Sequence, residues 1–149
     1  MRRTHILLVE DNADDEALTV RALRKSSVSS EVFVVRDGAE AVDYLLHQGH
    51  FATGEPRPLP QVVLLDLKLP KLDGLGVLRR IRADQRTSLI PVVILSSSDE
   101  DSDRRQSYTL GANSYVRKPV DFEEFLVAAQ QLGVYWLQLN QPPNPGQPG

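Results

Sequence analysis

Residues 61–74 read QVVLLDLKLPKLDG, and this stretch decides the fold of the chain. It begins with a short apolar run and ends in a polar turn, which is typical of a strand buried on both faces of a sheet. Asp66 stands where the apolar run ends. A charged carboxylate at such a position costs free energy unless it is paired or coordinated. We therefore expect Asp66 either to cap a neighbouring element or to carry out chemistry.

The size and composition of the chain indicate one globular domain of ordinary make-up. The 149 residues are 41% hydrophobic and 25% charged, as in proteins with a single core. A net charge of -3 favours neither nucleic acid nor an anionic membrane as a partner. With no cysteine, the sequence excludes disulfides, thiolate catalysis and cysteine-bound zinc. Since no signal peptide and no apolar stretch of membrane-spanning length is visible, we expect a cytoplasmic protein.

Short apolar segments alternate with longer helical patterns along the whole chain. The expected strands are residues 5–9, 31–35, 61–65, 91–95 and 114–117. The expected helices are residues 13–25, 37–47, 73–84, 99–110 and 121–139. Such alternation predicts an α/β fold, with a parallel sheet covered by helices on both faces. Five units favour the flavodoxin-like strand order 2-1-3-4-5, which binds ligands at the carboxyl ends of strands one and three.

Several expectations concern where the helices begin and end. Asp37 has the spacing of a capping box, and Gly49 is suited to close the second helix. Gly133 is expected to bend the last helix or to end it early. The helix at 99–110 has few apolar residues, so we expect it to be loosely anchored. Residues 140–149 are rich in Pro and are predicted to form a disordered tail.

Three carboxylates are expected to meet at one crevice of this fold. Glu10 and Asp11 follow the first strand and Asp66 follows the third, and these two strands are neighbours in the predicted order. Converging carboxylates repel one another, and a hard divalent cation relieves the repulsion. An all-oxygen ligand set suits Mg²⁺, with the backbone carbonyl of Lys68 as a further candidate ligand. The alternative is that Glu10 and Asp11 only help to cap the first helix.

Two other polar side chains end strands at the same edge of the predicted sheet. Ser96 ends the fourth strand, and Lys118 ends the fifth. A hydroxyl and an ammonium group beside a metal-bound carboxylate can contact the oxygens of a phosphoryl group. Taken singly, each residue also has a plain interpretation, a turn serine and a solvated lysine.

This set of short motifs at strand ends resembles the receiver domain of two-component response regulators. The motifs are Glu10-Asp11-Asn12, Asp66-Leu67-Lys68-Leu69-Pro70, Asp73-Gly74, Ser96 and Lys118-Pro119. The resemblance covers about residues 5 to 139 and implies a receiver domain over 1–139, with no output domain after it. It also implies a role for each site residue: phosphoacceptor for Asp66, Mg²⁺ ligand for Glu10 and Asp11, switch hydroxyl for Ser96, switch aromatic for Tyr115 and phosphate contact for Lys118.

A closer likeness is to the short regulators partnered with bacterial and cyanobacterial phytochrome kinases. It depends on the Pro-rich loop at 56–60, on residues 35–41 and on the ending at 136–140. The likeness implies a phytochrome-type sensor histidine kinase as partner. A phosphohistidine of that kinase would donate its phosphoryl group to Asp66, and the signal would leave by contact with a downstream protein.

The sequence departs from the commonest receiver pattern around the acceptor residue. Glu10 replaces a frequent Asp, which lengthens one metal-ligand arm, and Ser96 replaces Thr but keeps the hydroxyl. Lys68 and Ser98 occupy the positions that flank the phosphoryl group in this fold. We expect these two residues to affect how water reaches the acyl phosphate.

The end of the last helix carries more apolar area than one buried stripe needs. Tyr135, Trp136 and Leu139 lie close together there. Core packing explains part of this area, and a homodimer seam explains the rest. The sequence thus predicts a candidate seam at these three residues.

Three other functions are compatible with parts of the sequence. A haloacid-dehalogenase-type phosphatase also phosphorylates an Asp at a strand end, but it needs a second Asp as general acid where this chain has Lys68. A flavin mononucleotide carrier shares the predicted fold, but Glu10 and Asp11 would repel the phosphate of the cofactor. The third alternative is a receiver-like scaffold that is never phosphorylated.

Overall fold

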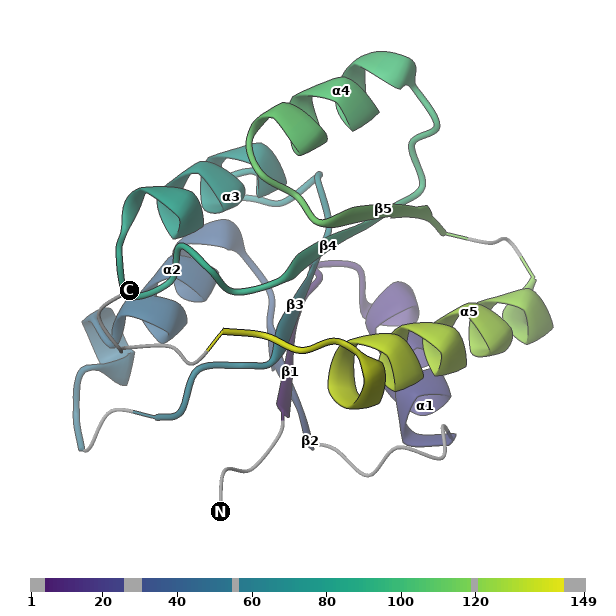
Figure 1. The fold of residues 1–149 in the computed structure, drawn as a ribbon, viewed down its shortest axis with the longest axis horizontal. Coiled ribbons are helices and arrows are strands. Elements are labelled where there is room, and N and C mark those ends of the chain that lie inside the picture. Colours follow the sequence, from purple (N-terminus) through teal and green to yellow (C-terminus); the bar gives the residue numbers. More distant parts are fainter. Residues whose placement is uncertain (1–4, 26–30, 55–56, 119–120, 144–149) are drawn as a thin grey trace.

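The five strands of the protein form one parallel sheet. The computed structural model describes residues 5–25, 31–54, 57–118 and 121–143. The strands are β1 (His5–Val9), β2 (Glu31–Val35), β3 (Val62–Leu65), β4 (Val92–Ser96) and β5 (Ser114–Arg117). They lie in the order β2-β1-β3-β4-β5, and all neighbouring pairs are parallel (Figure 1). The predicted flavodoxin-like topology is therefore confirmed, although β3 and β4 each begin one residue later than expected.

Five α-helices cover the two faces of this sheet. They are α1 (Ala13–Lys25), α2 (Gly38–Leu46), α3 (Gly74–Ala83), α4 (Asp101–Thr109) and α5 (Phe122–Val134). Helices α1 and α5 pack together on one face, and α2, α3 and α4 lie on the other (Figure 1). Two short helical segments follow α2 and α5: the 3-10 helix η1 (Gly49–Phe51) and the π-helix η2 (Tyr135–Leu139). In the part of the chain that the structure describes, no helix is long and apolar enough to cross a membrane.

Strand β3 contributes side chains to both halves of the core. Val63 and Leu65 pack with α2 and α3, whereas Val62 and Leu64 pack with α1 and α5. All four side chains are at most 2% exposed. Full burial of a Val or Leu side chain contributes about 1.5–3 kcal/mol. The strand that precedes Asp66 is thus held from both sides, as the apolar run predicts, and so gives that residue a rigid base.

The helix ends agree with the predicted caps except at the end of α2. The Asp37 carboxylate accepts a 2.7 Å hydrogen bond from the Glu40 N–H, and Asp73 caps α3 in the same way through the Gly76 N–H. The prediction that Gly49 closes α2 is wrong. His47 ends the helix with a left-handed φ of 54°, and Gly49, also at positive φ, begins η1 instead.

The last helix changes its winding just after Gly133. Helix α5 ends at Val134, and η2 continues with π-helical turns. This agrees with the expectation that Gly133 ends or bends the helix. The indole of Trp136 is buried in the same core cluster as Phe125 and Ala129. Of the tail predicted to be disordered, residues 144–149 lie outside the described residues.

Helix α4 is attached mainly through polar groups. Ser107 is its one buried residue, and the Ser107 hydroxyl donates to the Asp103 carbonyl of the same helix. The small buried face agrees with the expectation that apolar contacts anchor this helix weakly.

The guanidinium group of Arg82 holds three segments together at the amino-terminal edge of β4. It donates hydrogen bonds of 2.8 to 3.0 Å to the backbone carbonyls of Ser88, Ile90 and Gly111 and to the Asn113 side chain. Burial lowers the pKa of Arg82 from its ordinary value. The bonds join the end of α3 to the α3–β4 loop and to the turn before β5, and so fix the start of β4.

Candidate functional site

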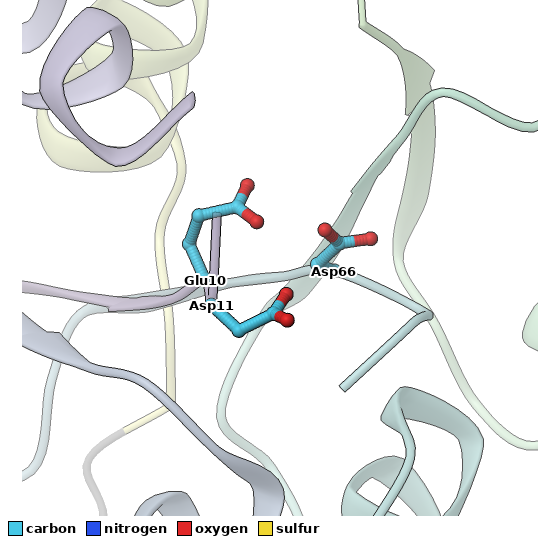
Figure 2. A group of neighbouring side chains, drawn as sticks. All are labelled: Glu10, Asp11 and Asp66. Carbon is cyan, nitrogen blue, oxygen red and sulfur yellow. The ribbon is translucent and has the colours of Figure 1, made fainter. Parts of the chain in front are cut away.

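Three carboxylates lie at the carboxyl edge of β1 and β3. Val9 pairs with Leu65 in the parallel register, so the residues that follow these strands leave the sheet side by side. Ligand oxygens of Glu10, Asp11 and Asp66 all lie within 4.8 Å of one another. Figure 2 shows the three side chains around one small space, with Glu10 and Asp11 from the end of β1 and Asp66 from the end of β3. The predicted acidic crevice is therefore present.

Backbone hydrogen bonds fix the positions of Glu10 and Asp66, which carry two of these carboxylates. The Glu10 N–H donates to the Val35 carbonyl at 3.0 Å, and the Asp66 N–H donates to the Val9 carbonyl at 3.1 Å. Both bonds continue the sheet pattern one residue beyond the strands. The acidic side chains thus extend from backbone that the sheet holds rigid. A precise site needs such a rigid base.

Helix α3 begins directly against the backbone of Asp66. A Cβ atom at Gly74 would lie 2.2 Å from the Asp66 carbonyl oxygen, so a side chain has no room there. The Gly74 N–H donates to the Leu67 carbonyl at 2.8 Å. Glycine at position 74 is therefore required by this close approach, which holds the loop after β3 in place.

The ammonium group of Lys118 bridges the acidic cluster. Its Nζ lies 2.5 Å from Glu10 Oε1, 2.9 Å from Asp15 Oδ2 and 3.1 Å from Asp66 Oδ2. The Lys118 side chain is only 7% exposed. Its backbone N–H donates to the Ser96 carbonyl at 2.7 Å, so the end of β4 sets the position of the lysine. The sequence predicts Lys118 at this edge but not its contact with Asp15.

Burial and pairing shift the pKa values of the two innermost groups. Burial, followed by the hydrogen bond and charge of Asp66, raises the pKa of Glu10 to about 7, although Lys118 opposes the shift. For Lys118, burial alone would lower the pKa. Hydrogen bonds to Glu10 and Asp15 and the charges of Asp66 and Glu10 outweigh burial and raise the Lys118 pKa above its ordinary value. The site thus holds a firmly charged lysine among acids that do not all ionise freely.

The set of donor atoms in the crevice suits a hard divalent cation. Glu10, Asp11 and Asp66 offer only oxygen ligands. Burial and the neighbouring Asp66 raise the pKa of Glu10 even with Lys118 in contact, and a bound divalent cation would favour the ionised carboxylate. The Lys68 N–H donates to Asp66 Oδ1 at 3.3 Å, which places the backbone of Lys68 beside the Asp66 carboxylate.

Ser96 and Tyr115 are linked through Ser98. The Ser96 hydroxyl, in a residue that is 1% exposed, accepts a 3.2 Å hydrogen bond from the Ser98 N–H. The Tyr115 hydroxyl donates to the Ser98 carbonyl at 2.9 Å. The Ser98 hydroxyl donates to Asp103 of α4 at 2.5 Å. A chain of hydrogen bonds therefore runs from the end of β4 to β5 and α4.

The residues of the predicted seam differ in how far they face the solvent. Tyr135 is 49% exposed and Leu139 is 64% exposed. Trp136 is only 7% exposed and fills the core of its own chain. A seam at η2 would therefore depend on Tyr135 and Leu139.

Pro119, which follows the site lysine in the motif, lies outside the described residues.

Comparison with known protein families shows to which family this chain belongs. The model of the response regulator receiver domain matches residues 6–130. The chain belongs to this family. Receiver domains act in signalling rather than in metabolism. The family match therefore argues against the phosphatase and the flavin carrier considered above. Phosphorylation of an Asp residue is the mechanism of the family.

Two relatives of this receiver chain align over most of both lengths. The probable methanogenesis regulatory protein FilR2 of Methanothrix harundinacea is 43% identical, with 94% of this chain and 88% of the relative covered. The response regulator Rcp1 of Synechocystis is 37% identical, with 89% and 88% covered. The relationship thus extends through nearly the whole chain.

Solved structures of regulators share the receiver fold described above. The phosphorylated cyanobacterial phytochrome response regulator RcpA has a TM-score of 0.87 at 39% identity, covering 95% of this chain and 99% of its own. The bacteriophytochrome response regulator RtBRR is 52% identical with a TM-score of 0.75, covering 95% and 84%. The Mn²⁺-bound form of Rcp1 has a TM-score of 0.86 at 35% identity, covering 95% and 99%. These structures support the receiver fold, and one of them is a Mn²⁺-bound form.

Proposed function

We propose that Asp66 accepts a phosphoryl group from a phosphohistidine of a sensor histidine kinase. An Asp66 carboxylate oxygen attacks phosphorus, and the P–N bond to the kinase imidazole breaks as the P–O bond forms. The observation that carries this proposal is the 3.1 Å contact between Lys118 Nζ and Asp66 Oδ2 beside two further carboxylates. The contact places a fixed cation next to the oxygen that would receive the phosphoryl group. Phosphoryl transfer depends on such positioning and charge neutralisation.

The metal in this proposal is Mg²⁺, held by Glu10, Asp11 and Asp66 with the Lys68 carbonyl as a further ligand. When bound, Mg²⁺ neutralises charge on the oxygens of the transferred group. The chain's own residues then do the rest: the β1–β3 edge orients the acceptor, and Lys118 supplies a second positive charge. Support for a divalent cation comes from the all-oxygen donor set and from the Mn²⁺-bound relative Rcp1.

The response to phosphorylation would pass through Ser96 and Tyr115. The product adds roughly -1.5 to -2 charges at Asp66, by the values for phosphorylated side chains. In our proposal the Ser96 hydroxyl leaves the Ser98 N–H to bond a phosphoryl oxygen. Ser98 then shifts, and with it the Tyr115 hydroxyl and Asp103 of α4. The weakly buried α4 would be the element that changes position.

The partner kinase in this proposal is of the phytochrome type. Support comes from RcpA and RtBRR, which are described as phytochrome and bacteriophytochrome response regulators. The relative FilR2 is described as a probable methanogenesis regulatory protein, so related chains also include regulators that are not named for phytochromes. The signal would leave by protein contact, through α4 and β5 to a downstream protein.

We also propose a homodimer seam at the end of α5 and in η2. Tyr135 and Leu139 are each about half exposed or more, at 49% and 64%. Sedimentation of the Tyr135→Ala and Leu139→Ser double variant tests the seam, because neither side chain is needed in the core. A monomeric wild type, or a double variant that still dimerises, contradicts it.

Intact mass spectrometry after incubation with a phytochrome-type kinase, first phosphorylated with ATP and then freed of ATP and Mg²⁺, tests the acceptor. We expect wild type to gain one phosphoryl group in Mg²⁺ and none in EDTA, and Asp66→Asn to gain none. Asp73→Asn is the matched control, because this exposed residue lies in the same β3–α3 segment and Asn keeps the N-cap. A wild type that never gains the group supports the unphosphorylated scaffold instead.

A further inference from the structure

Asp15 is a third acidic partner of Lys118 and is not one of the three clustered carboxylates. Its Oδ2 lies 2.9 Å from Lys118 Nζ, from the first turn of α1. The Asp15 side chain is 36% exposed, so its charge is partly screened by water. Asp15 thus contacts the site from a separate element, across from β3.

A general preference for acids at helix starts does not account for this contact. The first turn of α1 contains Asp14, Asp15 and Glu16, and all three favour the helix dipole. Glu16 pairs with Arg36 at 2.9 Å, and Asp14 is exposed. In the described part of the chain, Asp15 is the member of this turn that contacts Lys118.

The lysine has no spare hydrogen-bond donor in this arrangement. An ammonium group offers three N–H donors and no acceptor. Lys118 contacts three carboxylates, at 2.5 Å (Glu10), 2.9 Å (Asp15) and 3.1 Å (Asp66). A phosphoryl oxygen on Asp66 can accept a hydrogen bond from Lys118 only if one of these carboxylates loses its own hydrogen bond to the lysine. Of the two others, Asp15 is the more exposed and does not belong to the clustered carboxylates.

We propose that Asp15 is a positioning residue that competes with Asp66 for Lys118 and so weakens the hold of the lysine on a phosphoryl group. The proposal rests on the proposed function of Asp66. It predicts effects of opposite sign when the Asp15 charge is removed. A phosphoryl group should be held more tightly, because Lys118 directs more of its charge to Asp66. A divalent cation should be held less tightly, because the site loses one negative charge.

The test measures two dissociation constants in the full chain. Mg²⁺ binding is followed by isothermal titration calorimetry, and binding of beryllium trifluoride, a phosphoryl mimic, by ¹⁹F NMR at saturating Mg²⁺. For Asp15→Asn we expect Mg²⁺ affinity to fall and beryllium trifluoride affinity to rise, each by about two- to fivefold, as for one partly exposed ion pair. Asp15→Glu keeps the charge and should remain within twofold of wild type, by the same estimate.

Asp14→Asn is the matched control, because it removes the same charge from the same helix turn at an exposed position. We expect less than half the effect of Asp15→Asn in either measurement. Unchanged constants for Asp15→Asn, a fall in both, or equal effects in Asp14→Asn would overturn the proposal. If wild type binds neither probe and gains no phosphoryl group from the kinase, the proposed function itself fails, which is a separate result.

Discussion

The Tyr115 hydroxyl donates a 2.9 Å hydrogen bond to the carbonyl oxygen of Ser98, the residue whose N–H reaches the Ser96 hydroxyl. The ring of Tyr115 packs against the core beneath α2 and α3. One residue of the β4–α4 loop therefore joins the buried hydroxyl at the end of β4 to the aromatic side chain of β5. A movement of Ser96 can reach Tyr115 without any direct contact between them.

We predict that Tyr115→Phe lowers the free energy of unfolding by about 0.5–1.5 kcal/mol, the usual contribution of one hydrogen bond. The ring keeps its packing, so the loss comes from the bond to Ser98. Urea unfolding followed by circular dichroism measures the change. Tyr108→Phe is the control, because Tyr108 is 52% exposed on α4 and its substitution should have almost no effect. Equal losses in the two variants would show that the Ser98 bond contributes nothing.

We predict that Lys118→Met destabilises the metal-free protein by about 3 kcal/mol at pH 8, as when one partner of a buried ion pair is removed. The substitution leaves the buried Glu10 and Asp66 without their cation. The loss should be smaller at pH 5, where Glu10 can take up a proton at little cost. Urea unfolding at the two pH values measures both effects.

Lys71→Met is the control for the loss of a lysine. The Lys71 side chain is 71% exposed and lies 3.7 Å from Asp37, so we expect a change within about 0.5 kcal/mol. A Lys118→Met protein as stable as this control at pH 8 would contradict the account of the site as a paired cluster.

The raised pKa of Glu10 predicts how stability depends on pH. The folded protein holds the Glu10 proton up to about pH 7, whereas the unfolded chain releases it near 4.5. The folded state therefore binds more protons between these values, and stability falls as pH rises through this window. Thermal unfolding in EDTA from pH 4.5 to 8 should show this fall in Tm.

Glu10→Gln and added Mg²⁺ should each reduce that slope. The amide cannot ionise, and a bound cation favours the ionised carboxylate in the folded state. A Glu10→Gln protein with the same dependence of Tm on pH as wild type would show that another group titrates in this window.

We predict that Arg82→Lys lowers the free energy of unfolding by about 1–3 kcal/mol, because an ammonium group cannot reproduce the fork of the guanidinium. Carbonyls of the α3–β4 loop and of the turn before β5 would lose their donor. Chemical unfolding of Arg79→Lys gives the baseline, since Arg79 is exposed on the same helix. The structural account of Arg82 would be wrong if both substitutions had equal effects.

The sequence predicts the sheet well because its signals are local. Apolar runs that end in turns mark β1, β3 and β4, and the carboxyl ends of neighbouring parallel strands must meet. Glu10, Asp11 and Asp66 are therefore brought together by topology alone. Lys118 follows from the same rule, since it comes directly after β5 at the same edge of the sheet.

Other features depend on tertiary contacts that no local pattern encodes. Asp15 is one of three acids in a helix turn, and its sequence context does not distinguish it from Asp14. The left-handed residue that ends α2 is His47 rather than a glycine, although an L side chain at positive φ is uncommon. Helical spacing from Phe125 and Ala129 predicts the burial of Trp136, but the apolar pattern does not reveal the π-helical winding of η2.

The place of Lys118 in the chain bears on how the protein forms during synthesis. Glu10, Asp15 and Asp66 precede this lysine by 108, 103 and 52 residues. A nascent chain that ends before β5 already contains the acids but lacks their cation, so repulsion opposes the closure of β1 on β3. The complete set of ion pairs at this edge can therefore form only after β5 and Lys118 have been synthesised.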